Sequence, residues 1–209
     1  MPDQPSRQAQ LETLNAAVRA CTLCPLHRGR TKAVPGAGPV DAQIMLIGEG
    51  PGFHEDRQGL PFVGAAGQLL DELLAGIGIL RAEVYITNVV KCRPPQNRDP
   101  LPAEITACGS YLDEQLALIK PRVVITLGRF SMARWFPNAK ISAIHGRAKS
   151  IGGVLYIPML HPAAALHQPA WREQLEEDFR KIPVYLQQAE AADEGPADEP
   201  PAAQQLSLF

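Results

Sequence analysis

The amino-acid sequence predicts an α/β protein, a three-layer αβα sandwich with a central, mainly parallel sheet of four strands. Three observations predict this class: four short apolar runs typical of buried strands, helix-forming segments between them, and turn-rich loops that follow the strands. The chain has 209 residues, of which 45% are hydrophobic, so one domain with a substantial core is expected.

The predicted elements alternate along the chain. A weak helical period covers residues 8–19 and ends at the sequence CTLC. The apolar runs that predict strands are residues 43–48, 84–90, 123–127 and 154–160. The segments that predict helices after these strands are residues 65–77, 102–118, 130–136 and 171–187. Ligands of open α/β sheets bind beyond the carboxyl ends of the strands, so a site is expected among GEGPG, TNVVKCRPP and HPAAAL.

Charge divides the chain into a body and a tail. The formal net charge is -2, but residues 188–209 contain five Asp or Glu and no Lys or Arg. Residues 1–187 therefore carry 20 basic against 17 acidic side chains, a formal +3 that permits DNA binding without requiring it. Residues 188–209 have little to bury and are expected to form a disordered acidic tail.

The sequence carries no signal of secretion or membrane insertion. No apolar run reaches the ~18 residues of a membrane span. The start MPDQPSRQAQ does not follow the basic-then-apolar plan of a signal peptide. A cytoplasmic location without a membrane partner is expected, and cysteines in that compartment stay reduced.

The four cysteines favour a metal site over disulfides. Cys21 and Cys24 form a C-x2-C pair, and Cys92 and Cys108 stand alone further along the chain. The pair can face one metal from a single turn, and the other two can complete a four-thiolate site by folding. As an alternative, Cys92 and Cys108 are small buried hydrophobes. Spacing alone does not separate zinc from an iron–sulfur cluster.

Several motifs together resemble one known family. They are CTLCPLHRGRTKAVPGAG, GEGPGFHEDRQGLPFVGAAGQLL, VYITNVVKCRPPQNRDP, the single Cys108 and MLHPAAAL. In this order they resemble the family-4 uracil-DNA glycosylases, the iron–sulfur branch of bacteria and archaea, over residues 17–183. The resemblance implies a structural 4Fe-4S cluster held by Cys21, Cys24, Cys92 and Cys108.

The same resemblance implies a pocket for a flipped-out uracil, because a base inside a duplex is out of reach. Gly48, Glu49 and Gly50 would line it, since glycines let the backbone approach the base. Phe62 would stack on the uracil ring, although a Phe in LPFVG is as typical of plain core. Asn88 would pair with uracil N3–H and O4, or would cap a loop instead. His161 would donate a hydrogen bond to uracil O2 as negative charge develops there.

A carboxylate is needed to orient the attacking water. In the best-known uracil glycosylases the comparable loop is G-Q-D-P-Y, with a catalytic Asp and a methyl-excluding Tyr, and Gly50 and Gly52 occupy those places here. Glu49 is the nearest candidate for the water, and Glu55 and Asp56 are its rivals. His161 and Glu49 are thus the expected catalytic residues.

Basic and apolar residues near these motifs are candidates for DNA contacts. Those expected at phosphates are Lys91, Arg93, Arg98, Arg147 and Lys149. Leu166 is the candidate wedge for the gap left by the extruded base. In the best-known enzymes the wedge lies four residues after the His, and Ala165 occupies that place here.

The last five residues, QLSLF, resemble the bacterial motif that binds the replication sliding clamp. Its anchors would be Gln205, Leu206, Leu208 and Phe209. The acidic segment before them would serve as a flexible tether, and the protein itself is expected to be a monomer.

Three functions compete at this stage. The first is a monofunctional glycosylase that hydrolyses the N-glycosidic bond of deoxyuridine and leaves an abasic site, without a lysine nucleophile for lyase chemistry. The second is a module that binds uracil-DNA without turnover, but such relatives carry a long basic insertion that NVVKCRPPQNRDPLP lacks. The third is an iron–sulfur electron carrier. Turnover on deoxyuridine DNA separates them.

Overall fold

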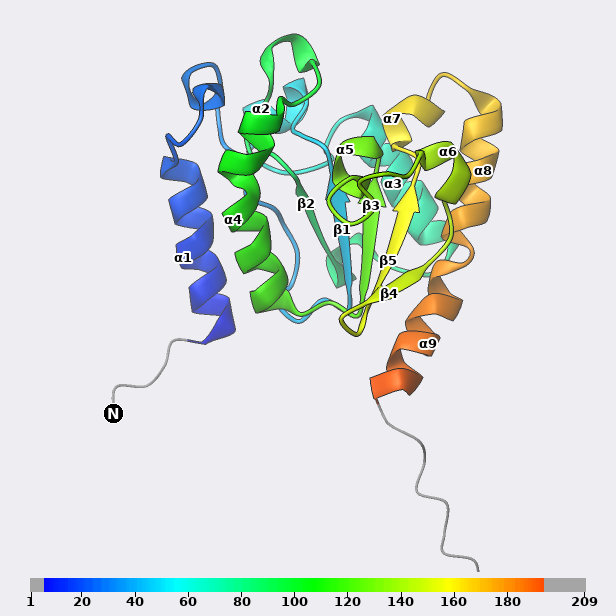
Figure 1. Cartoon of the computed structure of the whole chain (residues 1–209). Helices are drawn as coiled ribbons and strands as arrows, with labels where there is room; N and C mark the ends of the chain where they lie inside the picture. The colour runs from blue at the N-terminus through cyan, green and yellow to red at the C-terminus, as the bar shows by residue number, and fades with distance from the viewer. Residues whose placement is uncertain (1–5, 194–209) are drawn as a thin grey trace, which may run out of the picture.

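Four apolar segments form a parallel sheet, as predicted. The computed structural model describes residues 6–193. The parallel strands are β1 (Ile44–Gly48), β2 (Val84–Asn88), β3 (Val123–Leu127) and β5 (Val154–Met159), and the order across the sheet is β2-β1-β3-β5-β4 (Figure 1). All residues of β1, β2 and β3 are buried, which explains why these strands are continuous apolar runs.

The sheet has a fifth strand that the prediction of four missed. This strand, β4 (Lys149–Ile151), pairs antiparallel with β5 at the edge of the sheet. Gly152 and Gly153 connect the two strands with φ angles of +59° and +84°, a backbone that glycine adopts without steric cost. A three-residue, largely exposed strand gives no hydrophobic pattern, so the sequence did not reveal it.

Helices cover both faces of the sheet, which confirms the three layers. On one face, α1 (Arg7–Ala20) and α4 (Pro102–Ile119) pack on the strand residues that include Met45 and Ile47. On the other face, α3 (Ala65–Gly76), α8 (Pro169–Phe179) and α9 (Ile182–Asp193) pack on the alternate residues, including Ile44 and Leu46 (Figure 1). Successive strand side chains thus supply two separate cores.

Some helix predictions need correction. The helix expected over residues 130–136 is the single turn α5 (Arg129–Met132), and the one expected over residues 171–187 divides into α8 and α9. Three further short helices were not predicted, namely α2 (Phe53–Gln58), α6 (Ile141–Ile144) and α7 (Pro162–Ala165). The remaining turns are 3-10 helices: η1 (Pro25–Arg28), η2 (Arg81–Glu83) and η3 (Pro95–Asn97).

The boundary expected between body and tail lies inside α9. This helix continues to Asp193, and Ala189 is buried in the core. Residues 188–193 therefore belong to the folded body, contrary to the predicted tail from residue 188. The clamp-binding candidates Gln205, Leu206, Leu208 and Phe209 lie outside the described residues. Within residues 6–193, none of the helices has the length and apolar character needed to cross a bilayer.

Candidate active site

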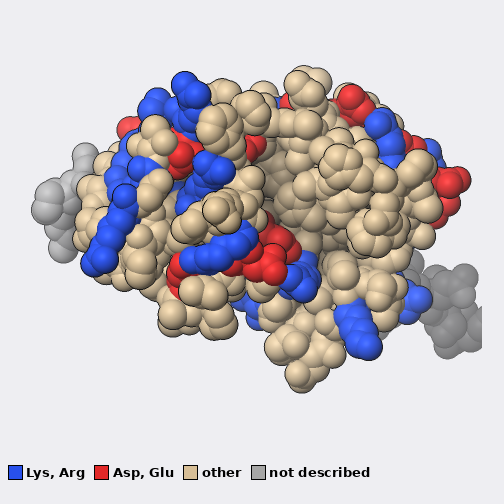
Figure 2. Space-filling view, turned by 90° about the horizontal axis from the view of Figure 1, so that it is seen from above, with Lys and Arg blue, Asp and Glu red and all other residues tan. Residues whose placement is uncertain are grey.

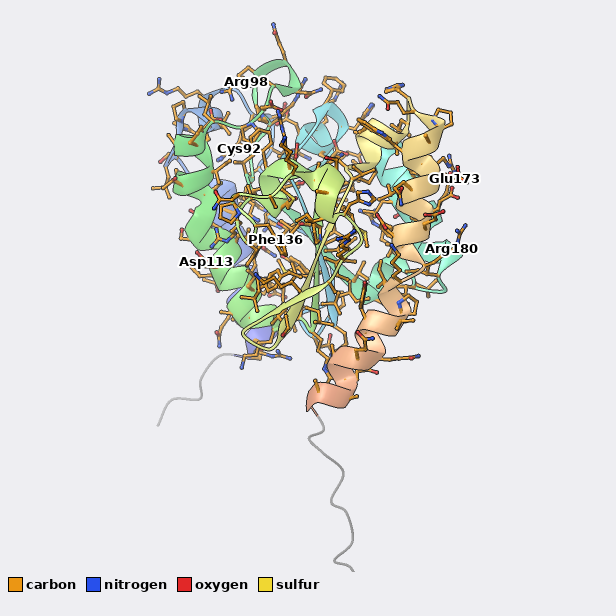
Figure 3. All side chains as sticks on the ribbon, turned by 45° about the vertical axis from the view of Figure 1, so that its right-hand side comes forward. Cys92, Arg98, Asp113, Phe136, Glu173 and Arg180 are labelled. Carbon is orange, nitrogen blue, oxygen red and sulfur yellow. The ribbon has the colours of Figure 1, made fainter. Side chains whose placement is uncertain are left out.

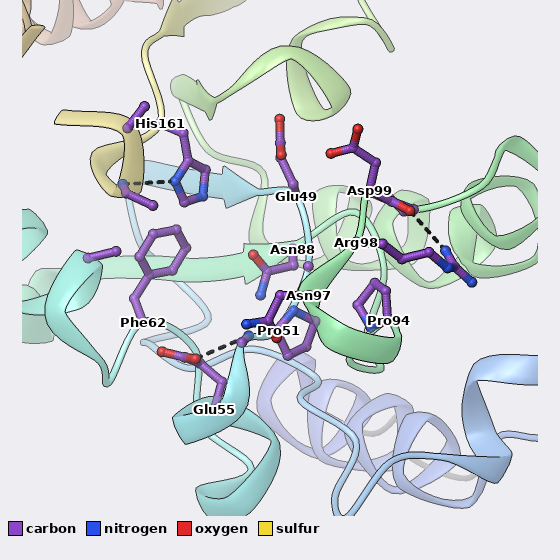
Figure 4. A pocket seen from close by; sticks show the side chains of 16 residues that line it. Glu49, Pro51, Glu55, Phe62, Asn88, Pro94, Asn97, Arg98, Asp99 and His161 are labelled. Carbon is purple, nitrogen blue, oxygen red and sulfur yellow. Dashed lines mark hydrogen bonds between the residues drawn. The ribbon is translucent and has the colours of Figure 1, made fainter. Parts of the chain in front are cut away.

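The carboxyl ends of β1, β2 and β5 open onto one pocket of about 400 Å³ (Figure 4). Glu49 and Gly50 follow β1, Asn88 ends β2, and His161 follows β5, so parallel strands bring together residues that are far apart in sequence. Phe62 joins them from the loop between α2 and α3. The volume lies within the range of about 300–1,000 Å³ that is usual for small-molecule pockets.

Gly48 makes the pocket possible without lining it. A Cβ atom at this position would lie 2.4 Å from Asn88 Oδ1 and 2.8 Å from the ring of Phe62. Any larger residue would push these two side chains out of the pocket. Gly50 lines the pocket directly, and a Cβ there would meet Val90 at 2.9 Å.

Asn88 brings an unsatisfied polar atom into the pocket. Its side chain is almost wholly buried, with 2% of the residue exposed, and Oδ1 has no hydrogen-bond partner within residues 6–193. An unpaired buried acceptor is unfavourable by about 1–3 kcal/mol. The carboxamide is therefore ready to accept a hydrogen bond from a ligand.

Phe62 lies in both the core and the pocket lining, and its stacking on a uracil ring stays a prediction. It belongs to the core beneath the sheet and also lines the pocket. Its φ angle of +51° is rare for an aromatic residue and is unfavourable by about 1–2 kcal/mol. Gly67 leaves space for this backbone, because a Cβ there would lie 1.9 Å from the oxygen of Phe62. The ring lies 5.7 Å from that of His161 between centroids, and the two planes are tilted by 23°.

The imidazole of His161 is a neutral hydrogen-bond donor. Its Nδ1 accepts a hydrogen bond from the backbone N–H of Ala163 at 3.1 Å (Figure 4), so the ring proton is on Nε2. Burial lowers the pKa of His161 to about 4, against an opposing effect of the Glu55 charge. At neutral pH the pocket thus contains an uncharged N–H donor.

Glu49 is a partly buried carboxylate at the rim of the pocket. Burial raises the pKa of Glu49, whereas the backbone N–H of Phe130, 3.1 Å from Oε1, and the charge of Arg129 lower it. Gly128 leaves space for this carboxylate, because a Cβ there would lie 2.4 Å from Glu49 Oε1. Asp99, which the sequence analysis did not select, also lines the pocket and pairs with Arg129.

The two rival carboxylates are engaged elsewhere. Glu55 accepts hydrogen bonds from the backbone N–H groups of Gly52, Val63 and Gly64 at 3.1, 2.8 and 2.9 Å. Asp56 is buried and accepts one from Thr31 N–H at 2.9 Å. Both therefore hold the loop around α2, although Glu55 also lines the pocket, and the choice of Glu49 as the carboxylate that orients water stays a prediction.

Comparison with known proteins gives the family. The Uracil DNA glycosylase superfamily matches residues 35–184. The "Type-4 uracil-DNA glycosylase" of Archaeoglobus fulgidus is 47% identical over 185 residues, which cover 82% of this chain and 92% of that protein. This chain belongs to the type-4 uracil-DNA glycosylases. The type-4 protein of Thermotoga maritima is 42% identical over 87% of this chain and 97% of its own. A "Type-5 uracil-DNA glycosylase" of Thermus thermophilus is 35% identical over 60% of this chain and 70% of its own.

In this type-4 glycosylase the four cysteines line one small cavity. Cys21 and Cys24 follow α1, Cys92 follows β2, and Cys108 lies in α4. All four thiols are free of disulfides. Three of the sulfurs accept N–H hydrogen bonds: Cys21 from Leu23 N–H at 3.5 Å, Cys108 from Lys91 N–H at 3.4 Å, and Cys92 from the Arg30 guanidinium at 3.1 Å. No three His, Cys, Asp or Glu of residues 6–193 are arranged to hold a single metal ion.

The prediction that Lys91 contacts DNA is wrong. Only 1% of the residue is exposed, and its ammonium donates to Thr87 Oγ1 at 2.6 Å, Gln115 Oε1 at 2.7 Å and the backbone oxygen of Asn88 at 2.8 Å. Burial lowers the pKa of Lys91 to about 7. A position among basic residues suggested exposure, but buried acceptors from β2 and α4 surround this side chain.

The other basic candidates lie at or near the surface. Arg98 donates to both carboxylate oxygens of the buried Glu104 at 2.9 and 2.7 Å and so fixes the pocket rim to α4. Figure 3 shows Arg98 at the same end of the molecule as Cys92. Arg93 donates to Asn97 at 2.7 Å. Arg147 and Lys149 are exposed. Figure 2 looks onto this end and shows basic side chains at several places around a central hollow. Their contacts with DNA stay predictions.

The two wedge candidates differ in exposure. Leu166 directly follows α7 and is 40% exposed, whereas Ala165, the last residue of α7, is only 3% exposed and belongs to the core. Of the two, only Leu166 has a side chain available to the duplex.

Proposed function

We propose that this chain excises uracil from DNA: it takes a flipped-out deoxyuridine into the pocket, hydrolyses the N-glycosidic bond and leaves an abasic site for base excision repair. Membership of the type-4 uracil-DNA glycosylases supports this activity. The observation that carries the proposal is the unpaired Oδ1 of Asn88 in a pocket that also contains a neutral imidazole donor.

The chemistry of Asn88 selects uracil over cytosine. Uracil has a donor at N3 and an acceptor at O4, so an Asn carboxamide can accept from the first and donate to the second. Cytosine has an acceptor at N3 and an amino donor at C4, so a carboxamide kept in the same orientation would face acceptor with acceptor and donor with donor. A site with unpaired buried polar groups rejects such a ligand strongly.

The reaction breaks the bond between sugar C1′ and base N1, and the bonding electrons move onto the uracil. The Nε2–H of His161 donates a hydrogen bond to uracil O2, where this negative charge gathers. A water molecule oriented by Glu49 adds its oxygen to C1′ and gives its proton to the carboxylate. The raised pKa of Glu49 makes it a stronger base than an exposed carboxylate.

Release of free uracil from an oligonucleotide with one deoxyuridine tests the activity. Asn88→Ala and His161→Ala should each lower kcat/KM by about 100-fold or more. The exposed Asn138→Ala variant is the matched control and should remain fully active. A protein that binds the oligonucleotide but releases no uracil would support the non-turnover binding module instead.

We further propose that Cys21, Cys24, Cys92 and Cys108 hold a 4Fe-4S cluster. Four thiols from three chain segments face one cavity, and N–H donors approach three of the sulfurs, as suits thiolates around a cluster. When bound, the cluster would tie α1 to the loop after β2. Iron and sulfide analysis of purified protein tests this, and zinc in their place would refute it. Cys92→Ser should lose the visible absorption of the cluster.

The remaining proposals concern partners. Residues Gln205, Leu206, Leu208 and Phe209 would bind the bacterial sliding clamp, a proposal that rests on the sequence QLSLF alone. Deletion of residues 205–209 should abolish binding to purified clamp and leave uracil release from free oligonucleotides unchanged. We also propose that the protein acts as a monomer in the cytoplasm, which sedimentation and fractionation would check.

A further inference from the structure

A second cavity of about 670 Å³ adjoins the uracil pocket. The two share Glu49, His161 and Ala164, but Asn88 and Phe62 line only the uracil pocket. The second cavity therefore begins at the two catalytic side chains and extends away from the residues that hold the base. Its outer walls come from α6, the start of α8 and the segment of Gly128.

Trp171 presents an aromatic surface to this cavity. It lies in the first turn of α8, and 41% of the residue is exposed, a large share for a tryptophan. Within residues 6–193 it has no aromatic partner, whereas Trp135 packs on Tyr156 at 4.7 Å between centroids. Exposed aromatic rings in nucleic-acid clefts serve as stacking platforms for unpaired bases.

His145 presents a fixed imidazole to the same cavity. Its Nδ1 lies 2.6 Å from Oδ2 of Asp178, a fully buried carboxylate that also accepts from Lys181 at 2.7 Å. Gly146 allows this contact, because a Cβ there would lie 1.8 Å from Asp178 Oδ1. The carboxylate takes one ring nitrogen, and Nε2 has no partner in the described part of the chain. Because Asp178 Oδ2 accepts the proton of Nδ1, the ring can donate from Nε2 only as an imidazolium, a form that an anionic phosphate on its other side would stabilise.

We propose that this cavity binds the nucleotide next to uracil on the same DNA strand. Trp171 stacks on the base of this neighbour, and His145, as an imidazolium held between Asp178 and the strand, donates a hydrogen bond from Nε2 to its phosphate. The inference rests on the proposed function, because the flipped deoxyuridine fixes the strand at Glu49 and His161. A strand that enters both cavities is held on each side of the glycosidic bond: the uracil lies in the first cavity, and the backbone that carries its sugar is fixed by the neighbour in the second.

Oligonucleotides with an abasic residue on the 5′ or the 3′ side of deoxyuridine test the stacking. On ordinary single-stranded substrate, Trp171→Ala should raise KM about tenfold with little change in kcat, and Trp171→Phe should stay near wild type. When the abasic residue occupies the stacked side, wild type and Trp171→Ala should become equal. A second readout is the fluorescence of 2-aminopurine at that neighbour, which wild type should quench and Trp171→Ala should not.

Uncharged linkages test the phosphate contact. His145→Ala should weaken binding to the normal strand but not to one with a methylphosphonate at the contacted position. A melting curve separates this effect from loss of the fold, since the substitution leaves Asp178 without one partner. Leu80→Ala, an exposed apolar residue outside both cavities, is the control.

The outcomes distinguish this inference from the proposed function. If wild type releases no uracil, the proposed function fails. If wild type releases uracil and Trp171→Ala is equally impaired with and without a neighbouring base, or not impaired at all, the neighbour subsite is refuted alone. An effect on one side only supports the subsite and gives the strand direction.

Discussion

The ammonium of Lys91 lies 2.8 Å from the backbone oxygen of Asn88, the residue that carries the unpaired carboxamide. The backbone N–H of the same lysine lies 3.4 Å from the sulfur of Cys108. One buried residue thus contacts both the end of β2 at the proposed uracil pocket and the cavity of the cysteines. The position of Asn88 therefore depends on Lys91 and on the loop that follows β2.

Replacement of Lys91 should therefore affect both stability and uracil binding. Lys91→Met fills a similar volume but leaves the acceptors of Thr87, Asn88 and Gln115 without the donor, a loss of about 2 kcal/mol in the free energy of unfolding. Urea unfolding measures the first effect, and inhibition by free uracil measures the second. The exposed Lys32→Met is the control. A Lys91→Met protein with wild-type stability and uracil affinity would contradict the role assigned to this contact.

The lowered pKa of His161 predicts a pH dependence of stability. Below a pH of about 6.5 the unfolded chain binds a proton here, whereas the folded protein does not until the pH nears its folded pKa of about 4. The unfolded state binds more protons in this window, so the free energy of unfolding decreases as the pH is lowered. At about pH 5 this loss is roughly 2 kcal/mol relative to neutral pH. His161→Gln should remove this part of the loss.

Urea unfolding at about pH 7 and about pH 5 measures the difference between wild type and His161→Gln. The exposed His167→Gln variant serves as a control for the loss of a histidine. Equal losses of stability in wild type and His161→Gln would show that His161 titrates normally.

Glu49 should determine the acid limb of the rate profile. Because burial raises its pKa, the active carboxylate is lost as the pH falls through a value above the ordinary 4.5. Glu49→Gln should lower kcat by about 100-fold or more, change KM little and abolish that limb. Single-turnover rates across pH provide the measurement. Full activity in Glu49→Gln would assign the water to another group, with Asp99 as the next candidate in the pocket.

A methyl group at Gly128 should disturb the carboxylate without touching the base pocket. The residue has a φ angle of +98°, and its Cβ would meet Glu49 Oε1 at 2.4 Å. Gly128→Ala should be about 1–2 kcal/mol less stable and should lose about tenfold in kcat. Gly152→Ala is a matched control, since that residue has φ +59° with open space around it. It should share the backbone strain and keep kcat, and equal kcat values in the two variants would refute the steric argument.

The sequence predicted what depends on local pattern and missed what depends on packing. Four buried strands were found because their residues are mostly apolar, and the strand ends together with the family resemblance led to Asn88 and His161. The break between α8 and α9 had a signal in Pro183, which lacks the N–H that a continuous helix needs. Lys91 was misjudged because its acceptors come from distant segments, among them Gln115 of α4. Trp171 and His145 gave no pattern, since their cavity exists only in the fold.

The order of the strands also determines when the protein can act. Glu49 follows β1 and His161 follows β5, and β3 lies between these strands in the sheet. The proposed catalytic pair is complete only after the sheet closes across β3. A nascent polypeptide on the ribosome, or a fragment released before β5 is made, carries the cysteines and the carboxamide but no imidazole at this position. By the proposed mechanism such a fragment cannot cleave glycosidic bonds, and activity begins only once β5 and His161 have been made and folded.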